Sequence, residues 1–301
     1  MTLRRLKETV KGPGFTRSVA VVAVVGLLVL LSYQAALFGF VRLDAQDHDG
    51  LDAFLASDFV ISHRGALAEC PENTLSGLEF AYEQGIRLIE IDVMMTEDNV
   101  PILFHDPSLD RTTNGTGSVT RSAWNYVRAL DAGSWFSEEF AGERVPLMSE
   151  VFEWLSERPD LFLWVHLRFD RGDAEMSALI RQCEVESQVV VQVDAYEVER
   201  FRHYQDCLGR ACIIKEPLLG MVAWHTAKCR SYNVQFLTIM DVMDSSALYD
   251  LTEAGGFKVV LTRNFQADGD HVLSRLRGPA WGYVLDSAVV GGAVQAELAA
   301  L

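Results

Sequence analysis

The spacing of short apolar runs is the feature that most constrains the fold of this chain. Nine runs rich in Val, Ile, Leu and Phe have the length and composition of buried strands. They cover residues 59–63, 86–93, 101–105, 161–167, 188–193, 211–215, 235–239, 258–262 and 281–285. Most neighbouring runs are separated by amphipathic stretches long enough for a helix, so they can be parallel strands joined by helical crossovers.

The second and third runs are the exception, because only a few residues around Glu97-Asp98-Asn99 separate them. A parallel crossover needs about a dozen residues, so these two runs are predicted to form an antiparallel hairpin. Without the hairpin arm, eight strands remain, which is the pattern of an α/β protein built as a (β/α)8 barrel, or TIM barrel. Residues 106–160 are predicted to form an excursion over its active-site end. An open doubly wound sheet ranks lower, since its Gly-rich phosphate-binding motif is missing from the sequence.

The stretch 18–41 contains no charged residue. Its 24 residues suffice to cross a hydrocarbon core of about 30 Å as a helix. A basic tail, 1–17, precedes it, and an acidic tether, 42–57, follows it. The positive-inside rule then predicts a transmembrane signal anchor with a cytoplasmic N-terminus and a periplasmic or otherwise extracytoplasmic domain, 58–301. A cleaved signal peptide is the alternative, although its apolar region is usually only about 7–15 residues long.

The chain carries a net charge of −16, and the excess of acidic residues lies beyond the basic N-terminal tail. Phosphate contacts to nucleic acid need clustered Lys and Arg, so we expect no nucleic-acid partner. The five cysteines are scattered and match no zinc motif. We expect them to be small buried residues, with a bridge such as Cys207–Cys212 as the alternative outside the cytoplasm.

Polar side chains stand at the predicted C-terminal ends of the first two strands, where barrels of this type hold reactive groups. His63 and Arg64 close the first run, and Gly65 permits a sharp exit of the backbone. Glu90 and Asp92 are two residues apart on the second run, so both carboxylates project from the same face. Two converging buried carboxylates repel each other unless a cation is present, and oxygen ligands suit Mg²⁺ or Ca²⁺.

The predicted hairpin brings a second histidine to this carboxylate pair. A two-residue turn at Glu97-Asp98 would place His105 opposite Glu90, with Asp106 next to it. Two imidazoles, an arginine and a metal-bound phosphate are the parts that phosphodiester cleavage requires. Taken singly, each of these residues has a structural alternative, such as a histidine that only packs in the core or an arginine that only forms a salt bridge.

In this order and spacing, the residues resemble the motifs of the glycerophosphodiester phosphodiesterase family. The resemblance rests on His63-Arg64-Gly65, Pro71-Glu72-Asn73-Thr74, Glu90-x-Asp92-Val93, Thr96-x-Asp98, His105-Asp106 and residues 110–117, and more weakly on residues 282–286. It implies a TIM barrel that hydrolyses glycerophosphodiesters, or related lysophospholipids, to an alcohol and glycerol phosphate. Such a protein would act in lipid and glycerol metabolism.

The resemblance also implies roles for individual residues. His63 and His105 would be the acid/base pair, Glu90 and Asp92 would bind one divalent cation, and Arg64 would hold the phosphate. Two further acids, Glu72 and Asp106, are expected to support the site, the first as a partner of Arg64. Asn73 and Thr74 are expected to cap the following helix, and residues 112–117 to be loop architecture.

Two positions depart from the family pattern. Where the family usually has Glu-x-Lys, as third metal ligand and second phosphate contact, this chain has His166 and Arg168. Arginine keeps the positive charge, whereas a ligating His166 would favour Mn²⁺ or Zn²⁺ over Ca²⁺. Alternatively, water or another acid completes the metal shell. Leu261 stands where the family commonly has Trp, so an aromatic wall of the substrate site is expected to be missing.

These features favour a metal-dependent phosphodiesterase that acts on glycerophosphodiesters or lysophospholipids near a membrane surface. A catalytically altered barrel that binds a phosphorylated ligand as a scaffold is the alternative, motivated by His166. The presence of both acid/base histidines argues against it. A third reading keeps catalysis but has an internal hydroxyl attack the phosphorus, which gives a cyclic phosphate.

Overall fold

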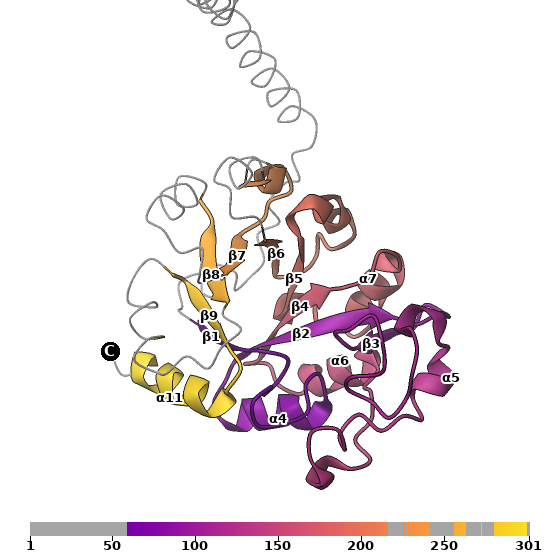
Figure 1. Cartoon of the computed structure of the whole chain (residues 1–301). Helices are drawn as coiled ribbons and strands as arrows, with labels where there is room; N and C mark the ends of the chain where they lie inside the picture. Colours follow the sequence, from indigo (N-terminus) through magenta and orange to yellow (C-terminus); the bar gives the residue numbers. More distant parts are fainter. Residues whose placement is uncertain are drawn as a thin grey trace, which may run out of the picture. The chain divides into compact units, whose positions relative to one another are not determined.

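Nine strands form a single sheet, and eight of them close into a barrel (Figure 1). The residues described in this computed structural model are 59–215, 225–226, 228–240, 256–262, 272 and 280–299. Neighbouring strands follow the order β1-β9-β8-β7-β6-β5-β4-β2, and β1 also pairs with β2. Every pairing around this ring is parallel. The (β/α)8 barrel expected from the spacing of the apolar runs is therefore confirmed.

All nine predicted strands are present, with bounds within two residues of those expected. The described strands are β1 (Phe59–Ser62), β2 (Leu88–Met95), β3 (Pro101–Leu103), β4 (Phe162–Leu167), β5 (Val189–Asp194), β6 (Gly209–Ile214), β7 (Phe236–Met240), β8 (Lys258–Thr262) and β9 (Gly282–Leu285). The described α-helices are α4 (Leu75–Glu83), α5 (Trp124–Val127), α6 (Met148–Ser156), α7 (Asp173–Gln182) and α11 (Ala288–Ala299). The 3-10 helices are η1 (Val119–Arg121), η2 (Glu138–Phe140), η3 (Glu186–Gln188) and η4 (Ala195–His203).

Strands β2 and β3 form the predicted antiparallel hairpin, but their register differs by one residue from the prediction. Val93 pairs with Leu103, so His105 does not lie opposite Glu90. The physical reason is the turn, in which Asn99 adopts the left-handed backbone conformation (φ 58°) and lengthens the loop. Because β3 ends at Leu103, His105 lies beyond the paired part of the hairpin, and its direction is not set by strand alternation.

Alternation along the strands divides their side chains between the barrel interior and the side that faces the helices. The interior cluster consists of Phe59, Ile61, Leu88, Trp164, Val190, Leu208, Ala211, Phe236, Val260, Trp281 and Val284. Next to this cluster, Oε1 of Gln192 accepts hydrogen bonds from the Trp164 indole at 2.8 Å and from the Thr238 hydroxyl at 2.7 Å. These side chains fill the barrel, so residues at the C-terminal strand ends lie above a closed floor.

Leu261 belongs to the side of the sheet that faces the helices. It is fully buried in the main core cluster together with Val259, whereas Val260, between them, faces the barrel interior. The Leu261 side chain therefore does not line the barrel interior, and the expectation that an aromatic wall is missing from the substrate site stays a prediction. Strand alternation directs its side chain away from the barrel interior.

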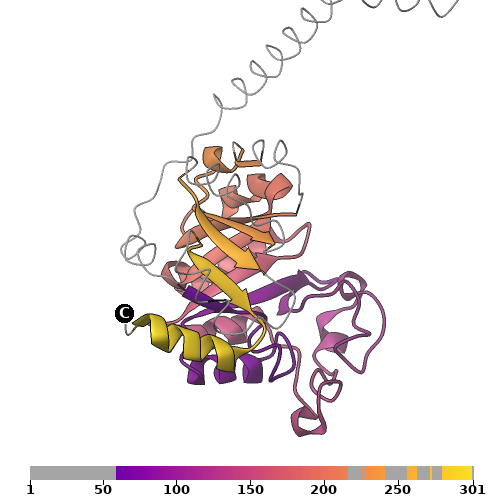
Figure 2. The same ribbon diagram turned by 60° about the vertical axis from the view of Figure 1, so that its left-hand side comes forward.

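Between β3 and α6 the chain leaves the barrel and packs around a small core of its own (Figure 2). That core contains Met94, Ile102, Phe104, Leu109, Val119, Val127, Leu130, Ala132 and Val145. Helix α6 packs into the main core through Val151, Phe152 and Leu155. The excursion is thus a folded unit, which can hold side chains over the barrel in fixed positions.

The last helix ties the end of the chain to its first barrel elements. Helix α11 lies beside α4 in both views (Figures 1 and 2). Oε1 of Gln295 accepts a hydrogen bond from the Val60 backbone N–H at 3.0 Å. At the start of α11, the Glu69 carboxylate accepts hydrogen bonds from the Ser287 hydroxyl and the Ala288 N–H. These contacts fix the loop that follows β9 against the loop that follows β1.

All five cysteines are free, and four of them are buried, as expected from their scattered spacing. Burial raises the pKa of Cys70 to about 11, which makes its thiol unreactive at neutral pH. Every described residue belongs to the unit 44–301. Within the described part of the chain, no helix combines the length and apolarity needed to span a membrane. The predicted anchor 18–41 and the flanking segments 1–17 and 42–57 lie outside the described residues.

Gly65 combines a left-handed backbone (φ 90°) with a close approach to α4, since a Cβ there would lie 3.0 Å from the carbonyl carbon of Gly77. We predict that Gly65→Ala lowers the free energy of unfolding by about 2–4 kcal/mol, measured by urea denaturation. Gly85 has a similar backbone (φ 86°) with nothing within 4 Å. Gly85→Ala should therefore cost only about 1–2 kcal/mol. Equal losses in the two variants would contradict the role of the close contact.

Candidate active site

The ends of β2 and β4 bring three potential metal ligands together. Asp92 pairs with His166 across these neighbouring strands, and Nδ1 of His166 lies 3.3 Å from Oδ1 of Asp92. Glu90, Asp92 and His166 are all buried, and each offers one ligand atom within 4.8 Å of the others. Two carboxylates and one imidazole form a donor set that fits a divalent cation.

The two buried carboxylates have pKa shifts in opposite directions, because their neighbours differ. Burial and the neighbouring Asp92 charge raise the pKa of Glu90. Burial also acts to raise the pKa of Asp92, but the hydrogen bond and charge of His166, together with Arg64, hold it well below its usual range. A cation between the two carboxylates would favour the ionised form of both.

Arg64 is held in an uncommon backbone conformation that directs its guanidinium toward these carboxylates. Its φ is 51°, in the left-handed region that residues other than glycine rarely adopt. Its backbone N–H donates to Oε2 of Glu90 at 3.1 Å, and its carbonyl accepts from the Asn73 N–H at 2.9 Å. In the side chain, Nη1 donates to Oε1 of Glu72 at 2.8 Å, and Nε lies 3.3 Å from Oδ2 of Asp92. Glu72 is therefore a partner of Arg64, as expected.

His63 is oriented by a carboxylate from the far end of the chain. Its Nδ1 lies 2.6 Å from Oδ1 of Asp286, which follows β9, and its Nε2 lies 3.9 Å from Oε2 of Glu90. Burial acts to lower the pKa of His63, but the hydrogen bond to Asp286 and the charge of Glu90 outweigh it. The pKa of His63 is raised overall.

His105 has a matching carboxylate partner from the excursion. Its Nδ1 lies 2.5 Å from Oδ1 of Asp106, whose Oδ2 accepts from Nε of Arg111 at 2.5 Å. Burial and the nearby positive charge of Arg64 lower the pKa of His105, against the opposing effect of Asp92. The hydrogen bond from Arg111 is the main reason that the pKa of Asp106 is lowered to about 2. The carboxylate beside His105 is therefore ionised at neutral pH.

Arg111 joins the surroundings of both histidines. Besides its bond to Asp106, it donates through Nη1 and Nη2 to the two oxygens of Glu72, at 2.7 and 2.8 Å. Glu72 in turn accepts from Arg64. One bidentate arginine thus links the arginine after β1 to the carboxylate that orients His105.

Asn73 supports a metal ligand instead of capping a helix. Its Nδ2 donates to Oδ2 of Asp92 at 3.2 Å, and its Oδ1 accepts from the Asp92 backbone N–H at 3.1 Å. Helix α4 is capped by Thr74 alone, whose hydroxyl oxygen accepts from the Gly77 N–H at 3.2 Å. The expectation that Asn73 caps the helix is wrong, because both of its amide atoms bond to Asp92.

Arg168 reaches from the end of β4 to the other side of the site. Its Nε donates to the backbone carbonyl of His105 at 2.9 Å, and its Nη1 lies 3.5 Å from Oδ1 of Asp92. An unbroken series of contacts therefore joins all nine residues that the sequence singled out. These are His63, Arg64, Glu72, Glu90, Asp92, His105, Asp106, His166 and Arg168.

Three contributors to the site were not anticipated. Asp286 follows the last strand, and the closing register of β1 on β9 pairs Ser62 with Leu285, which brings Asp286 beside His63. A prediction of the register between the first and last strands would have identified Asp286 as a neighbour of His63. Arg111 lay within the family-like block 110–117, but its position in a long excursion gave no geometric indication of its partners. Asn73 gave a capping signal that its neighbour Thr74 fulfils.

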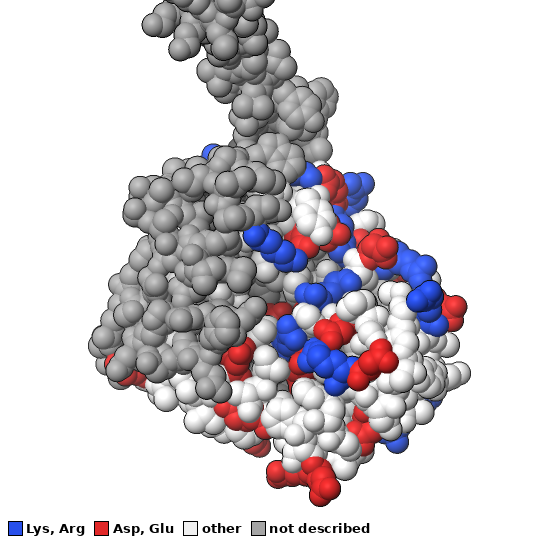
Figure 3. All heavy atoms as spheres, in the orientation of Figure 1, with Lys and Arg blue, Asp and Glu red and all other residues white. Residues whose placement is uncertain are grey.

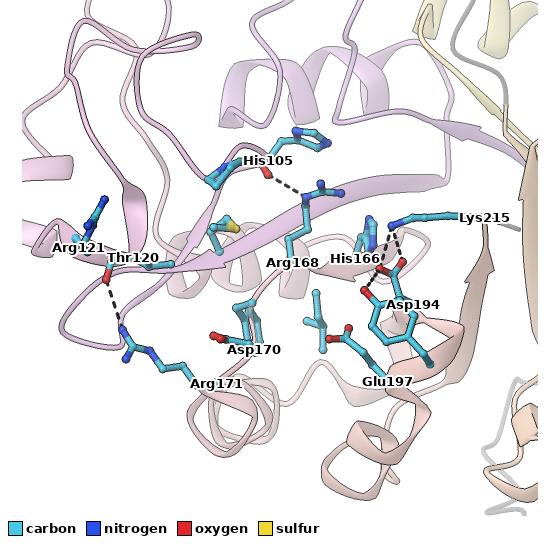
Figure 4. A pocket seen from close by; sticks show the side chains of 15 residues that line it. His105, Thr120, Arg121, His166, Arg168, Asp170, Arg171, Asp194, Glu197 and Lys215 are labelled. Atoms are coloured by element: carbon cyan, nitrogen blue, oxygen red, sulfur yellow. Dashed lines mark hydrogen bonds and ion pairs between the residues drawn. The ribbon is translucent and has the colours of Figure 1, made fainter.

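A cleft of about 640 Å³ opens beside the metal-ligand group (Figure 4). His105, His166 and Arg168 line its inner part, and Asp194 and Lys215 from β5 and the end of β6 line one end. Lys215 Nζ lies 2.7 Å from Oδ1 of Asp194. The cleft has the size of a small-molecule site.

The chain is similar to a family of known proteins over much of its length. The model of the glycerophosphoryl diester phosphodiesterase family matches residues 63–266. The glycerophosphodiester phosphodiesterase of Caldanaerobacter subterraneus subsp. tengcongensis is 34% identical over 180 residues, which cover 56% of this chain and 70% of that protein.

Solved structures show the same fold. The glycerophosphodiester phosphodiesterase of Agrobacterium tumefaciens superposes with a TM-score of 0.65 at 25% identity, covering 79% of this chain and all of that one. An Oleispira antarctica phosphodiesterase, solved with the product sn-glycerol-3-phosphate, gives a TM-score of 0.68 at 24% identity. That match covers 83% of this chain and 99% of that one.

The Asp286 carboxylate is one of the causes of the raised pKa of His63. We predict that Asp286→Asn, which keeps the shape but removes the charge, lowers the pKa of His63 relative to the unaltered chain. The titration is followed by NMR of the imidazole ring in the absence of divalent cations. The ring signals of His203, whose side chain is exposed and lies outside the site, serve as the internal reference. An unchanged His63 titration would mean that Asp286 does not stabilise the imidazolium.

Proposed function

The chain belongs to the glycerophosphoryl diester phosphodiesterase family, and from this premise we propose that it hydrolyses glycerophosphodiesters to glycerol phosphate and an alcohol. The observation that carries the proposal is a pair of histidines, His63 and His105, with opposite pKa shifts beside a buried group of metal ligands. Pairs of titratable groups with pKa values displaced in opposite directions are typical of an acid and a base.

The positive groups of the site would hold the phosphodiester. Arg64 and Arg168 both lie beside Asp92, within 3.5 Å, and their guanidinium groups can donate to phosphate oxygens. Glu90, Asp92 and His166 would hold the divalent cation. When bound, that cation supplies positive charge that stabilises the phosphorane-like transition state. His166 in this donor set favours Mn²⁺ or Zn²⁺ over Mg²⁺ or Ca²⁺.

The two histidines divide the proton transfers. His105, with its lowered pKa, is neutral near pH 7 and accepts a proton from the attacking water. His63, with its raised pKa, holds a proton more readily than His105 and donates it to the oxygen of the departing alcohol. One P–O bond forms to the water oxygen and one breaks to the alcohol, so the proton gained by His105 balances that lost by His63. Asp106 and Asp286 keep the two rings oriented.

We predict that the purified chain releases glycerol phosphate from glycerophosphodiesters only with a divalent cation, in the order Mn²⁺ or Zn²⁺ above Ca²⁺. His63→Ala and His105→Ala should each lower kcat by about 10²–10⁴-fold, because each removes a proton-transfer group. His166→Glu restores an all-oxygen donor set and should move the preference toward Mg²⁺ and Ca²⁺. A coupled assay for glycerol phosphate measures all three effects, and circular dichroism checks that each variant is folded.

If none of these cations supports the release of glycerol phosphate, the proposal is contradicted. Retained binding of the uncleaved diester would then favour the scaffold alternative. Phosphorus NMR of the products separates hydrolysis, which gives a phosphomonoester, from internal attack, which gives a cyclic phosphate. A cyclic product would contradict the role of water as the nucleophile.

We further propose that the enzyme acts at a membrane surface on glycerophosphodiesters or lysophospholipids, with residues 18–41 as its anchor. The support is the uncharged 24-residue span with a basic segment before it and an acidic one after it. In this arrangement the N-terminus is cytoplasmic and the catalytic domain is periplasmic or otherwise extracytoplasmic.

We predict that the full chain remains in the membrane pellet after washing with alkaline carbonate, whereas a variant lacking residues 1–57 is released into the supernatant. Protease added outside the cytoplasmic membrane should degrade the catalytic domain of the full chain. A full chain that the carbonate wash releases would contradict the anchor. A domain that resists the protease until the membrane is opened would contradict the orientation.

A further inference from the structure

The cleft beside the metal-ligand group extends beyond the residues assigned to the scissile phosphate. Thr120 and Arg121 from η1 line one of its walls, and Asp170 and Arg171 from the loop before α7 line another. In the view of Figure 4, Arg121 and Arg171 lie at the left-hand end and Lys215 at the right-hand end, and Arg168 lies between these two ends. Neither the proposed proton transfers nor the proposed contacts to the scissile phosphate involve the residues of this outer end.

The cationic side chains of the cleft differ in whether a carboxylate already neutralises them. Lys215 is paired with Asp194 at 2.7 Å. Glu197, a carboxylate of the lining, is paired at 3.3 Å with Arg200, which does not line the cleft. Arg121 and Arg171 form no ion pair in the described part of the chain, and Arg171 makes only a long hydrogen bond, 3.5 Å, to the Thr120 carbonyl.

After these pairs and the ion pair between Arg168 and Asp92 are set aside, two arginines of the described lining, Arg121 and Arg171, face a single carboxylate, Asp170. The cleft therefore has an excess of positive charge, although the whole chain carries a net charge of −16. Figure 3 shows Lys and Arg side chains near the middle of the displayed face, with acidic side chains among them and along its lower margin. A positive cleft on an acidic protein concentrates anions.

The described lining is poorly suited to a cationic head group. A quaternary ammonium is usually bound between aromatic faces, but Phe169 and Tyr196 are the only Phe or Tyr side chains in this part of the lining. Phe169 is buried under the guanidinium of Arg200, whose central carbon lies 4.7 Å from the ring centre. The Tyr196 hydroxyl donates to Asp194 at 2.8 Å.

We propose that Arg121 and Arg171 form a second anion-binding subsite, which selects glycerophosphodiesters that carry another anionic group besides the scissile phosphate. The inference rests on the proposed function, in which Arg64 and Arg168 bind the scissile phosphate and leave Arg121 and Arg171 for a second anion. A second phosphodiester fits the forked donors of two arginines.

The test compares three diesters that share the scissile group: bis(glycerophospho)glycerol, which has a second phosphodiester, glycerophosphoglycerol, which is otherwise neutral, and glycerophosphocholine, which is cationic. We expect kcat/KM to be highest for the first and lowest for the third. In Arg121→Gln/Arg171→Gln, the ratio between the first two substrates should fall about fivefold or more, in keeping with the loss of partly exposed charge contacts. The advantage of the first substrate should also shrink as ionic strength rises.

Arg128→Gln is the control for each single variant, Arg121→Gln and Arg171→Gln, because it removes one positive charge from an exposed arginine of the excursion that does not line the cleft. It should leave the ratio unchanged. A ratio that stays the same in the double variant, or that falls as far in Arg128→Gln as in the single variants, overturns the subsite while the proposed function stands.

Calorimetric titration with bis(glycerophospho)glycerol keeps the two proposals separable if no diester is hydrolysed. If none of the three diesters is hydrolysed, the proposed function is overturned. Weaker binding to the double variant than to the unaltered chain would still support the subsite, and equal binding would overturn it.

Discussion

The site depends on the electrostatic cost of placing Glu90 and Asp92 side by side in a closed barrel. Two buried carboxylates stay ionised only if positive charge or hydrogen-bond donors surround them. The described residues supply these in layers, with His166 and Arg64 against Asp92, His63 against Glu90, and the Asn73 amide on the backbone and side chain of Asp92. A divalent cation held by Glu90, Asp92 and His166 would complete this compensation, so one arrangement would serve both the ionised pair and the binding of metal.

Much of the fold follows from distances along the chain. Eight strand-sized runs with helix-sized gaps, and one gap too short for a crossover, are sufficient to predict the barrel and its hairpin. The register of the hairpin was harder to predict, because it depends on whether Asn99 adopts a left-handed conformation. The face occupied by Leu261 depends on strand alternation, and the sequence run 258–262 is apolar enough to hide which residues point inward.

The site was predictable where its residues lie on strands and less so where they lie on loops. Glu90, Asp92 and His166 follow from strand period and the C-terminal strand ends. Arg111 does not, because its bonds to Glu72 and Asp106 depend on how the excursion folds around its own core. Asp286 is an intermediate case, since the closure of the barrel places it beside His63, but only once the register of the first and last strands is known.

The contact between His63 and Asp286 spans 223 positions in sequence. During synthesis, the metal ligands and the phosphate-binding arginines leave the ribosome long before the residue that orients His63. Asp286 reaches His63 only after the final strand has docked on β1 and closed the barrel. The orientation of the His63 ring is therefore a property of the closed barrel and not of the first strand alone.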